Sequence, residues 1–123
     1  TFLEAAMIEV PNDMQGESLI PILFGEDHKW TRKSVYYHYY EYPSVHMVKR
    51  HYGIVNKDFK LVHFYYDVDE WELYDRKKDP KEMKNVYNDP KYSEIVEKLT
   101  KDLYDLRKKY KDSKELDQKF LTN

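Results

Sequence analysis

In two segments of the chain, apolar or aromatic side chains stand at odd as well as even positions, so both faces of a strand would carry them. This pattern is the strongest constraint on the fold. The two segments are residues 34–40 and 59–66. A strand buried on both faces reads as a near-continuous apolar run, whereas a strand with one solvated face alternates apolar and polar residues. A single helix covers only one face of a small sheet, and the other face would then be an aromatic patch of the kind that marks an interface. We therefore expect a missing partner, most simply the rest of a longer polypeptide, to cover that second face.

Four strands and one long helix are predicted. Runs rich in Tyr, Val and Phe between polar turns predict strands at residues 34–40, 51–55, 59–66 and 71–75. Asp89-Pro90 opens the last helix, with aspartate as the cap and proline in the first turn. Apolar residues then recur at steps of three and four, which gives one stripe: Tyr92, Ile95, Val96, Leu99, Leu103, Leu106 and Tyr110. The predicted class is α+β, a small four-stranded antiparallel sheet packed against a long C-terminal helix.

The segment that follows residue 71 has its own local signals. Trp71 to Asp75 mixes apolar bulk with a carboxylate, as a half-buried strand does. Asp79 is a typical helix cap, Pro80 suits a first helical position because that amide has no partner, and Glu82 stands at the capping-box position. We expect the short strand to run into a capped turn of helix.

Composition excludes several classes of protein. The 123 residues suit a single domain, and 21 basic against 23 acidic residues give a net charge of −2, which argues against a general nucleic-acid binder. No apolar run approaches the roughly 20 residues that span a bilayer. The chain has no cysteine, hence no disulfide framework, thiolate metal site or thiol nucleophile. Because it begins inside an expected helix over residues 1–7, we expect it to be cut from something longer.

The order of several motifs resembles the C-terminal part of the type I sulfatases, which depend on formylglycine and hydrolyse sulfate esters. The closing motif W-E-L-Y-D-x(3)-D-P-x-E-x-x-N over residues 71–85 carries the resemblance, together with residues 1–23. The block over residues 37–66 is similar to sulfatases that act on 6-O-sulfated N-acetylglucosamine in host glycans such as heparan sulfate and mucin. The motifs appear in the family's order over roughly residues 1–110, which no single short motif offers.

The resemblance implies an organisation of the whole protein. Residues 1–33 would be a linking segment from a missing N-terminal catalytic domain, 34–110 a C-terminal subdomain of sheet and helix, and 111–123 a loose polar tail. Calcium and formylglycine are expected in the missing domain, and the expected partners are that domain and a sulfated glycan, with a periplasmic or secreted location. The Cys- or Ser-x-Pro-x-Arg site that matures to formylglycine does not occur here. The fragment alone is therefore expected to be inactive and to contribute packing and the rim of the substrate pocket.

Five residues are predicted to bind substrate. His46 lies in a loop after Pro43, where an imidazole would meet a sugar hydroxyl or the sulfate, and Lys49 and Arg50 suit an anionic glycan. Because adjacent residues of an extended chain point to opposite sides, at most one of this basic pair faces the pocket. His51 and Glu41 complete the set, with Glu41 placed away from the sulfate that would repel it. For both residues an ordinary structural role is the alternative.

For the histidines within the predicted strands, we favour structural roles. His38 and His63 fall within strands and are expected to be satisfied sheet histidines. A zinc site from His46, His51 and His63 lacks the close paired spacing of zinc motifs and is rejected. The alternative to a sulfatase fragment is a self-sufficient carbohydrate-binding or protein-interaction module without catalysis, since the chain has 13 Tyr and 2 Trp.

Overall fold

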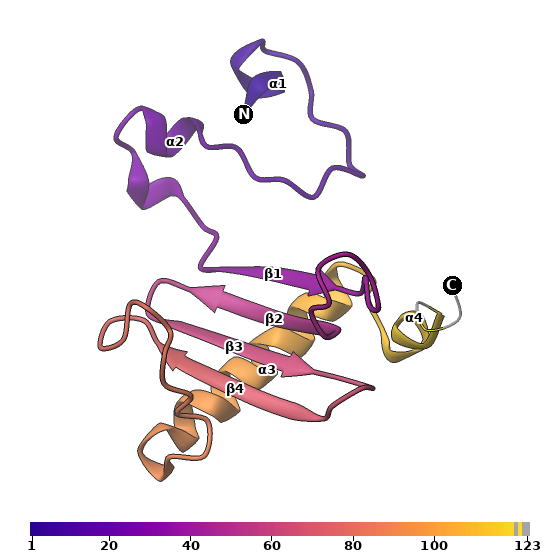
Figure 1. Cartoon of the computed structure of the whole chain (residues 1–123). Coiled ribbons are helices and arrows are strands. Elements are labelled where there is room, and N and C mark those ends of the chain that lie inside the picture. Colours follow the sequence, from indigo (N-terminus) through magenta and orange to yellow (C-terminus); the bar gives the residue numbers. More distant parts are fainter. Residues whose placement is uncertain (120, 122–123) are drawn as a thin grey trace. The chain divides into compact units, whose positions relative to one another are not determined.

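A computed structural model describes residues 1–119 and 121 of the chain (Figure 1). The chain divides into two compact units, residues 1–33 and residues 34–123, which we call unit 1 and unit 2. The boundary falls where unit 2 enters its first strand.

Unit 2 is built on a four-stranded antiparallel sheet in the order β1-β2-β3-β4. Its strands are β1 (Ser34–Tyr39), β2 (His51–Asn56), β3 (Phe59–Phe64) and β4 (Glu70–Asp75). The turn between β2 and β3 is closed by Asn56, whose Oδ1 accepts from the amides of Asp58 and Phe59 at 2.9 and 2.7 Å. The predicted α+β class is confirmed, and each strand lies within two residues of its expected bounds.

A single long helix covers one face of this sheet (Figure 1). The chain passes through a 3₁₀ turn, η2 (Pro90–Tyr92), into α3 (Ser93–Lys109). Asp89 begins it as predicted, because its side chain accepts from the Lys91 amide at 3.0 Å. The stripe on α3 packs onto the side chains of one sheet face, and the buried core consists of Tyr52, Ile54, Leu61, Tyr65, Leu73, Val86, Leu99 and Leu103.

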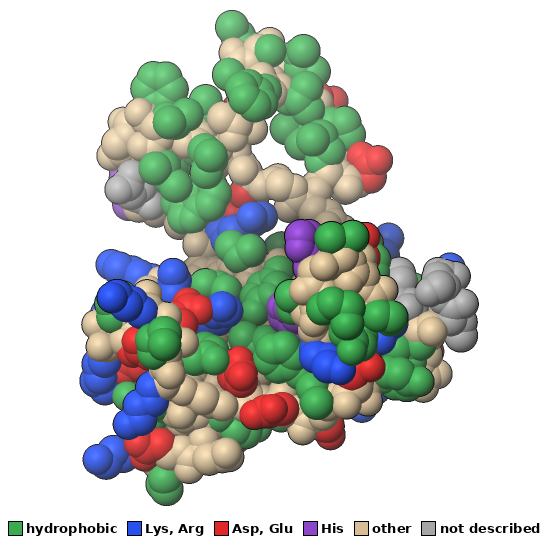
Figure 2. All heavy atoms as spheres, viewed as in Figure 1, with side chains coloured by type: hydrophobic (Ala, Val, Ile, Leu, Met, Phe, Trp, Pro, Cys, Tyr) green, Lys and Arg blue, Asp and Glu red, His purple; other side chains and the backbone are tan. Residues whose placement is uncertain are grey.

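Among the described residues of unit 2, no helix covers the other face of the sheet. Strand residues alternate between the two faces, so this second face carries Val35, Tyr37, Tyr39, His51, Gly53, Val55, Lys60, Val62, Phe64, Glu70, Glu72 and Tyr74. Figure 2 shows hydrophobic side chains over the middle of unit 2 with charged ones around them. Tyr37 lies across Gly53, where a Cβ would come within 2.7 Å of the tyrosine hydroxyl. The aromatic side chains therefore shield one another, while Val35 stays 51% exposed.

Asn85 explains why the closing motif ends on an amide. Its Oδ1 accepts from the Leu73 amide at 3.0 Å, and its Nδ2 donates to the Trp71 carbonyl at 3.1 Å. The amide of Val86 then donates to the Leu73 carbonyl at 2.8 Å. Residues 85–86 thus pair with the outer side of β4, which would otherwise be an open sheet edge.

The turn of helix predicted at Asp79 is wrong, because residues 76–86 form turns and irregular chain. Asp79 does cap a turn, since its Oδ2 accepts from the Lys84 amide at 2.7 Å. Glu82, however, has a φ of 53°, and its carboxylate pairs with Lys60 at 2.6 Å and Arg76 at 3.3 Å. These contacts with the sheet take the carboxylate away from the backbone amide that a capping box requires.

The loose tail predicted from Lys111 onward is also wrong over residues 111–119. The structure has a helix, α4 (Lys114–Lys119), in which Asp117 is buried against Arg107 of α3. Charged residues dominate this segment in the sequence, but two of its carboxylates are paired inside the fold. Residues 120 and 122–123 of the predicted tail lie outside the described residues.

Unit 1 holds short elements only: α1 (Phe2–Ala5), α2 (Ile20–Leu23) and a 3₁₀ turn, η1 (Asp27–Lys29). The expected helix over residues 1–7 is therefore shorter than predicted. Polar contacts hold the unit together, including the Leu19 amide to Thr1 at 2.8 Å and Arg32 to Glu17 at 3.3 Å. None of residues 1–26 and 28–33 is buried. Across the described part of the chain, no helix has the length and apolar character needed to cross a membrane.

Candidate functional site

Residues 40–49 of the loop between β1 and β2, which we call loop 40–49, carry three of the five predicted binding residues. Glu41 and His46 are exposed to solvent, and Lys49 is half-buried. A turn presents His46, since the amide of Met47 donates to the carbonyl of Ser44 at 3.1 Å. Among the described residues no hydrogen bond to the His46 ring is found, so its nitrogens are open to a ligand.

Lys49 lies against an aromatic ring at the base of this loop. Its ammonium donates to the Tyr42 hydroxyl at 2.8 Å and lies 4.2 Å from the centre of the Tyr42 ring. The hydrogen bond to Tyr42 raises the pKa of Lys49, so the side chain remains a cation. It supplies a fixed positive charge beside the loop.

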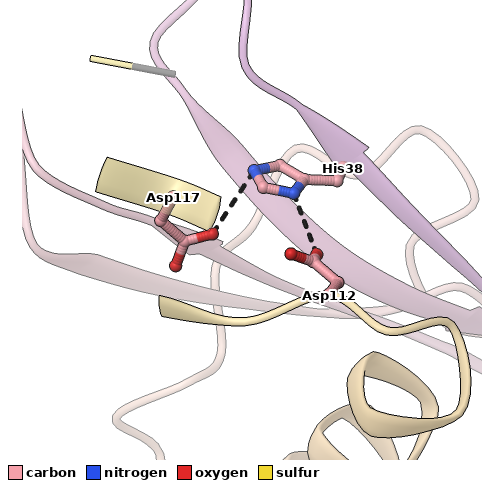
Figure 3. Close-up of side chains that lie close together, drawn as sticks. All are labelled: His38, Asp112 and Asp117. Carbon is pink, nitrogen blue, oxygen red and sulfur yellow. Dashed lines mark hydrogen bonds and ion pairs between the residues drawn. The ribbon is translucent and has the colours of Figure 1, made fainter. Parts of the chain in front are cut away.

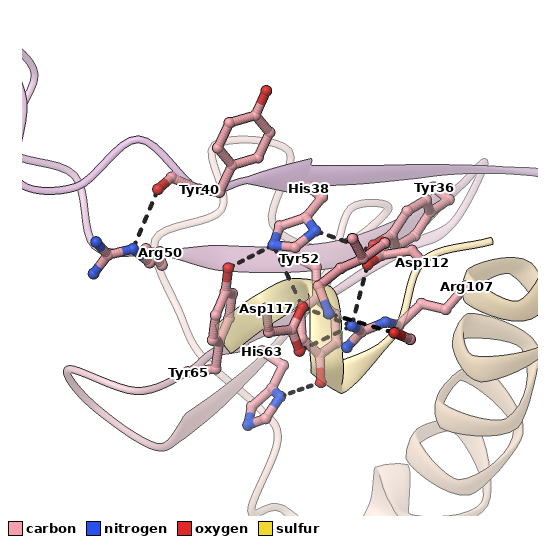
Figure 4. A network of polar contacts seen from close by, with 12 residues as sticks. Tyr36, His38, Tyr40, Arg50, Tyr52, His63, Tyr65, Arg107, Asp112 and Asp117 are labelled. Carbon is pink, nitrogen blue, oxygen red and sulfur yellow. Dashed lines mark hydrogen bonds and ion pairs between the residues drawn. The ribbon is translucent and has the colours of Figure 1, made fainter. Parts of the chain in front are cut away.

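Arg50 holds the loop in place from inside the fold (Figure 4). Only 5% of the residue is exposed. Its Nε donates to the carbonyl of Tyr40 at 3.2 Å, and its Nη1 donates to Asp67 at 3.2 Å. Arg50 thereby connects the start of loop 40–49 to the segment after β3, and its role in binding substrate stays a prediction.

His51 belongs to the second face of the sheet. Its Nδ1 donates to the Lys49 carbonyl at 2.8 Å, and its ring stacks on Tyr39 with centroids 5.5 Å apart. His63 pairs with Tyr52 rather than with His51 and so lies on the opposite face. The three histidines of the rejected zinc site are therefore not brought together by the sheet.

Both histidines predicted to be structural are satisfied. His63 bonds the Tyr52 hydroxyl through Nδ1 and Asp69 through Nε2, each at 2.7 Å. His38 Nδ1 lies 2.9 Å from Asp112 (Figure 3), and its Nε2 lies 2.6 Å from the Tyr65 hydroxyl (Figure 4). Since a carboxylate only accepts, the Nδ1 of His38 carries the proton and its Nε2 accepts from Tyr65.

A buried polar network that was not predicted from the sequence surrounds His38. Arg107 of α3 is 3% exposed, and its Nη2 donates to both oxygens of Asp117 at 2.8 and 2.9 Å. The guanidinium carbon lies 3.8 Å from the centre of the Tyr52 ring, and Nη2 also reaches Asp112 at 3.4 Å (Figure 4). We call Arg107, Asp112, Asp117 and His38 the C-terminal clasp, because they join the segment after α3 to the sheet.

Burial and pairing set the protonation of the clasp. Burial raises the pKa of the Asp112 carboxyl, but the Tyr36 hydroxyl and the Arg107 guanidinium outweigh this and hold it below its ordinary value. Burial lowers the pKa of His38, against the opposite pull of Asp112. Arg107 stays charged, since its bonds to Asp117 outweigh the effect of burial on its pKa.

His38, Asp112 and Asp117 offer ligand atoms within 4.8 Å of one another, a spacing that a metal ion could use. The guanidinium of Arg107 already occupies this position between the two carboxylates. A second cation there would be repelled at short range. The cluster therefore does not fit calcium and serves as a structural clasp.

One signal in the sequence could have identified Arg107. It follows Leu99 and Leu103 at steps of four, so it continues the buried stripe of α3. An arginine on a buried stripe requires a carboxylate partner, but the sequence does not say which one. The nearest acidic residues on the helix are not the ones it uses.

Comparisons with known proteins agree on one family. The family model of the C-terminal domain of N-sulphoglucosamine sulphohydrolase matches residues 1–109. An N-acetylglucosamine-6-O-sulfatase of Bacteroides thetaiotaomicron is 53% identical over 116 residues, which is 92% of this chain and 21% of the relative. A Delta 4,5-hexuronate-2-O-sulfatase of the same bacterium is 39% identical over 101 residues, 78% of this chain and 20% of the relative.

Solved structures give the same result. The structure of BT4656 in complex with its substrate D-glucosamine-2-N,6-O-disulfate superposes with a TM-score of 0.87 at 52% identity, covering 93% of this chain and 24% of that one. The chain thus spans about a fifth to a quarter of the length of these relatives.

Proposed function

The chain belongs to the family of C-terminal domains of N-sulphoglucosamine sulphohydrolase, and from that premise we propose that it is the C-terminal part of a sulfatase that removes 6-O-sulfate from N-acetylglucosamine in glycans. The observation that carries the proposal is the 53% identity to an N-acetylglucosamine-6-O-sulfatase over 92% of this chain. The match therefore extends over nearly the whole chain.

Exposed apolar side chains support an upstream catalytic domain as the partner. Nine large apolar side chains of unit 1 are exposed: Phe2, Met7, Ile8, Val10, Met14, Leu19, Ile22, Leu23 and Phe24. Unit 1 buries nothing among its described side chains, so it cannot offset the entropy of ordering its own backbone. The aromatic second face of unit 2 needs cover as well. A single upstream body that packs on both would account for unit 1 as a linking segment.

In the proposed enzyme, the upstream part carries the groups that react with the sulfate ester, and this chain supports them. Formylglycine and calcium, both in the upstream part, would supply the nucleophile for sulfur and positive charge for the sulfate oxygens. The clasp of this chain does not fit calcium, because Arg107 stands between its carboxylates. This chain alone is therefore inactive in our proposal.

The residues of this chain orient the substrate. His46 hydrogen-bonds a sugar hydroxyl or a sulfate oxygen from the tip of loop 40–49, and Lys49 adds a nearby positive charge. Glu41 accepts from a hydroxyl at a distance from the sulfate. Arg50 and His51 act through the loop, because their contacts fix its two ends.

Sulfate release tests the proposal directly. The full-length protein that contains this chain, matured with formylglycine, should release sulfate from 6-sulfated N-acetylglucosamine, and the 123-residue chain should release none. Failure of the matured protein to release sulfate from this sugar, while the related 2-O-sulfated sugars are hydrolysed, would reassign the substrate. Release from no sulfated sugar would refute the function.

His46→Ala tests the role of the loop. A hydrogen bond to a charged group contributes about 1.5–3 kcal/mol, so kcat/KM should fall by roughly 10- to 150-fold. Val45→Ala is the matched control, because Val45 is 92% exposed in the same turn and offers no polar group. Equal turnover for both variants would remove His46 from the site.

A further inference from the structure

A cavity of about 380 Å³ lies in unit 2 beside the segment that follows β3. Its floor is aromatic, with Tyr52, His63 and Tyr65, and its rim carries Tyr66, Asp69, Lys114 and Gln118. We propose that this cavity is a binding subsite for a neutral pyranose ring. The proposal deepens the proposed function and rests on it in one respect: the ring would be the glycan unit next to the sulfated sugar.

Tyr66 is held in a conformation that an aromatic residue rarely adopts. Its φ is 70°, and the amide of Asp67 donates to the carbonyl of Tyr65 at 3.0 Å, so Tyr66 is the central residue of a γ-turn. Positive φ is unfavourable for a bulky side chain, and this kind of γ-turn is strained. Yet the Tyr66 residue is 70% exposed, so burial of its ring does not explain the strain. Backbone strain of this kind clusters at binding sites.

The turn is fixed by contacts on both sides of Tyr66. The Tyr65 hydroxyl donates to His38 at 2.6 Å, and the Tyr65 amide donates to the Arg50 carbonyl at 3.2 Å. Asp67 accepts from the Arg50 guanidinium at 3.2 Å. Figure 4 shows Tyr65 beside His38, with Arg50 at the far end of the same network. The Tyr66 ring is therefore a preorganised platform, which lowers the entropy lost when a ligand binds.

Arg50 also defines which side of the ring is open. Its guanidinium lies 5.9 Å from the centre of the Tyr66 ring. This contact backs one face of the ring, so the other face is the one available to a ligand. An apolar ring face of this size suits the C–H face of a pyranose.

Polar groups around the cavity suit sugar hydroxyls. Asp69 has one oxygen bonded to His63 at 2.7 Å, and its side chain is 87% exposed, so its other oxygen can accept from a hydroxyl. Lys114 and Gln118 are four residues apart on α4 and so share one side of that helix. They supply an ammonium donor and an amide that both donates and accepts.

The charges favour a neutral sugar over a sulfated one. Asp117 also lines the cavity, but Arg107 neutralises it at 2.8 Å. The remaining rim charges, Asp69 and Lys114, balance each other. A sulfate or carboxylate on the bound ring would meet the carboxylate of Asp69, and the charges of the rim provide no second cation to offset it.

Two substitutions of Tyr66, to glycine and to phenylalanine, test the subsite. Tyr66→Gly removes the ring and relieves the positive φ, so this variant folds at least as stably as the parent. Tyr66→Phe keeps the ring face without the hydroxyl. Calorimetric titration of the full-length protein uses methyl β-glucoside, N-acetylglucosamine and the dimer N,N′-diacetylchitobiose, each up to about 20 mM so that a Kd of about 1 mM is detected.

The dimer should bind to the parent protein and to Tyr66→Phe with similar affinity, and about fivefold more weakly to Tyr66→Gly. Asp69→Ala should weaken binding as well, whereas Asp105→Ala, which removes an exposed carboxylate on α3, should not. Equal binding of the dimer to the parent and Tyr66→Gly, or no binding of any probe to the parent, overturns the subsite.

Sulfate release from 6-sulfated N-acetylglucosamine is measured on the same preparations. It separates the two proposals, since a protein that binds the dimer through Tyr66 but releases no sulfate keeps the subsite and loses the proposed function. The reverse result, release without a contribution from Tyr66, keeps the function and removes the subsite.

Discussion

Asp117→Ala should destabilise unit 2 far more than the loss of an ordinary charge. Arg107 is 3% exposed and gives two hydrogen bonds to Asp117, at 2.8 and 2.9 Å. Removing one partner of a buried pair costs about 3–5 kcal/mol, because the other charge stays buried without compensation. Asp112 remains 3.4 Å from the guanidinium and still offsets part of the charge. We therefore expect the lower end, a loss of about 3 kcal/mol, which is a large part of the roughly 5–15 kcal/mol that stabilises a domain.

Urea unfolding at pH 7, followed by circular dichroism, measures this loss, and hydrogen exchange locates it. The amides of β1 and of the C-terminal end of α3 should lose protection first. The control is Asp105→Ala, which breaks a 2.7 Å pair with Lys101 whose side chains are 76% and 65% exposed. An exposed pair of this kind contributes roughly 0.3–0.5 kcal/mol. If Asp117→Ala costs no more than the control, the account of the clasp is refuted.

A double-mutant cycle separates the pair from its surroundings. Arg107→Leu and Asp117→Ala each leave the charge of the other partner buried, whereas the double variant removes both charges of the pair. The double variant should therefore be more stable than the sum of the single effects predicts, by about 2 kcal/mol. Additive effects would mean that the two side chains do not depend on each other, contrary to their geometry.

Three further substitutions or conditions test the fold. Leu103→Ala, at a residue with no exposed surface, should lower the free energy of unfolding by about 2–5 kcal/mol in urea titrations; a loss below 1 kcal/mol would contradict its place in the core. Gly53→Ala puts a Cβ 2.6 Å from the Leu61 carbonyl, so thermal unfolding should occur at lower temperature, with a cost of about 1–3 kcal/mol. The pKa values of His38 and Asp112 lie below their ordinary 6.5 and 3.8 in the folded chain, so the unfolded chain binds these protons more readily. The contribution of His38 to the free energy of unfolding is complete above pH 6.5. The contribution of each group is lost as the pH falls through its folded-state pKa. A urea midpoint that does not change between pH 7 and pH 5 would contradict this.

The parts of the fold that the sequence predicted depend on apolar periodicity. The sheet and α3 follow from side chains whose burial is their main contribution, so the period of the pattern reports the face that is buried. The strands accordingly agree to within two residues, and the stripe on α3 contains both of its buried leucines, Leu99 and Leu103. The prediction that the long helix covers only one face of the sheet is confirmed within unit 2, whereas a missing partner over the other face stays a prediction.

The two errors have different physical causes. At Asp79 the local capping signal is present, but Glu82 finds stronger partners in Lys60 and Arg76, so contacts across the fold override the local preference. In the tail, a high density of charge suggested disorder. Asp117 is nevertheless buried because Arg107 pairs with it, and a pairing in space leaves no period in the sequence.

The polar clasp and the predicted binding loop turn out to be parts of one structure. In an antiparallel sheet, the end of β1, the start of β2 and the turn after β3 lie at the same end. His38 joins the clasp to Tyr65, and Arg50 joins the Tyr65 turn to the start of loop 40–49. The position of His46 at the tip of that loop therefore depends on buried polar bonds that begin at α4. It follows that a substitution of Asp112, which does not line the proposed subsite, should alter the binding of glycan as well as stability.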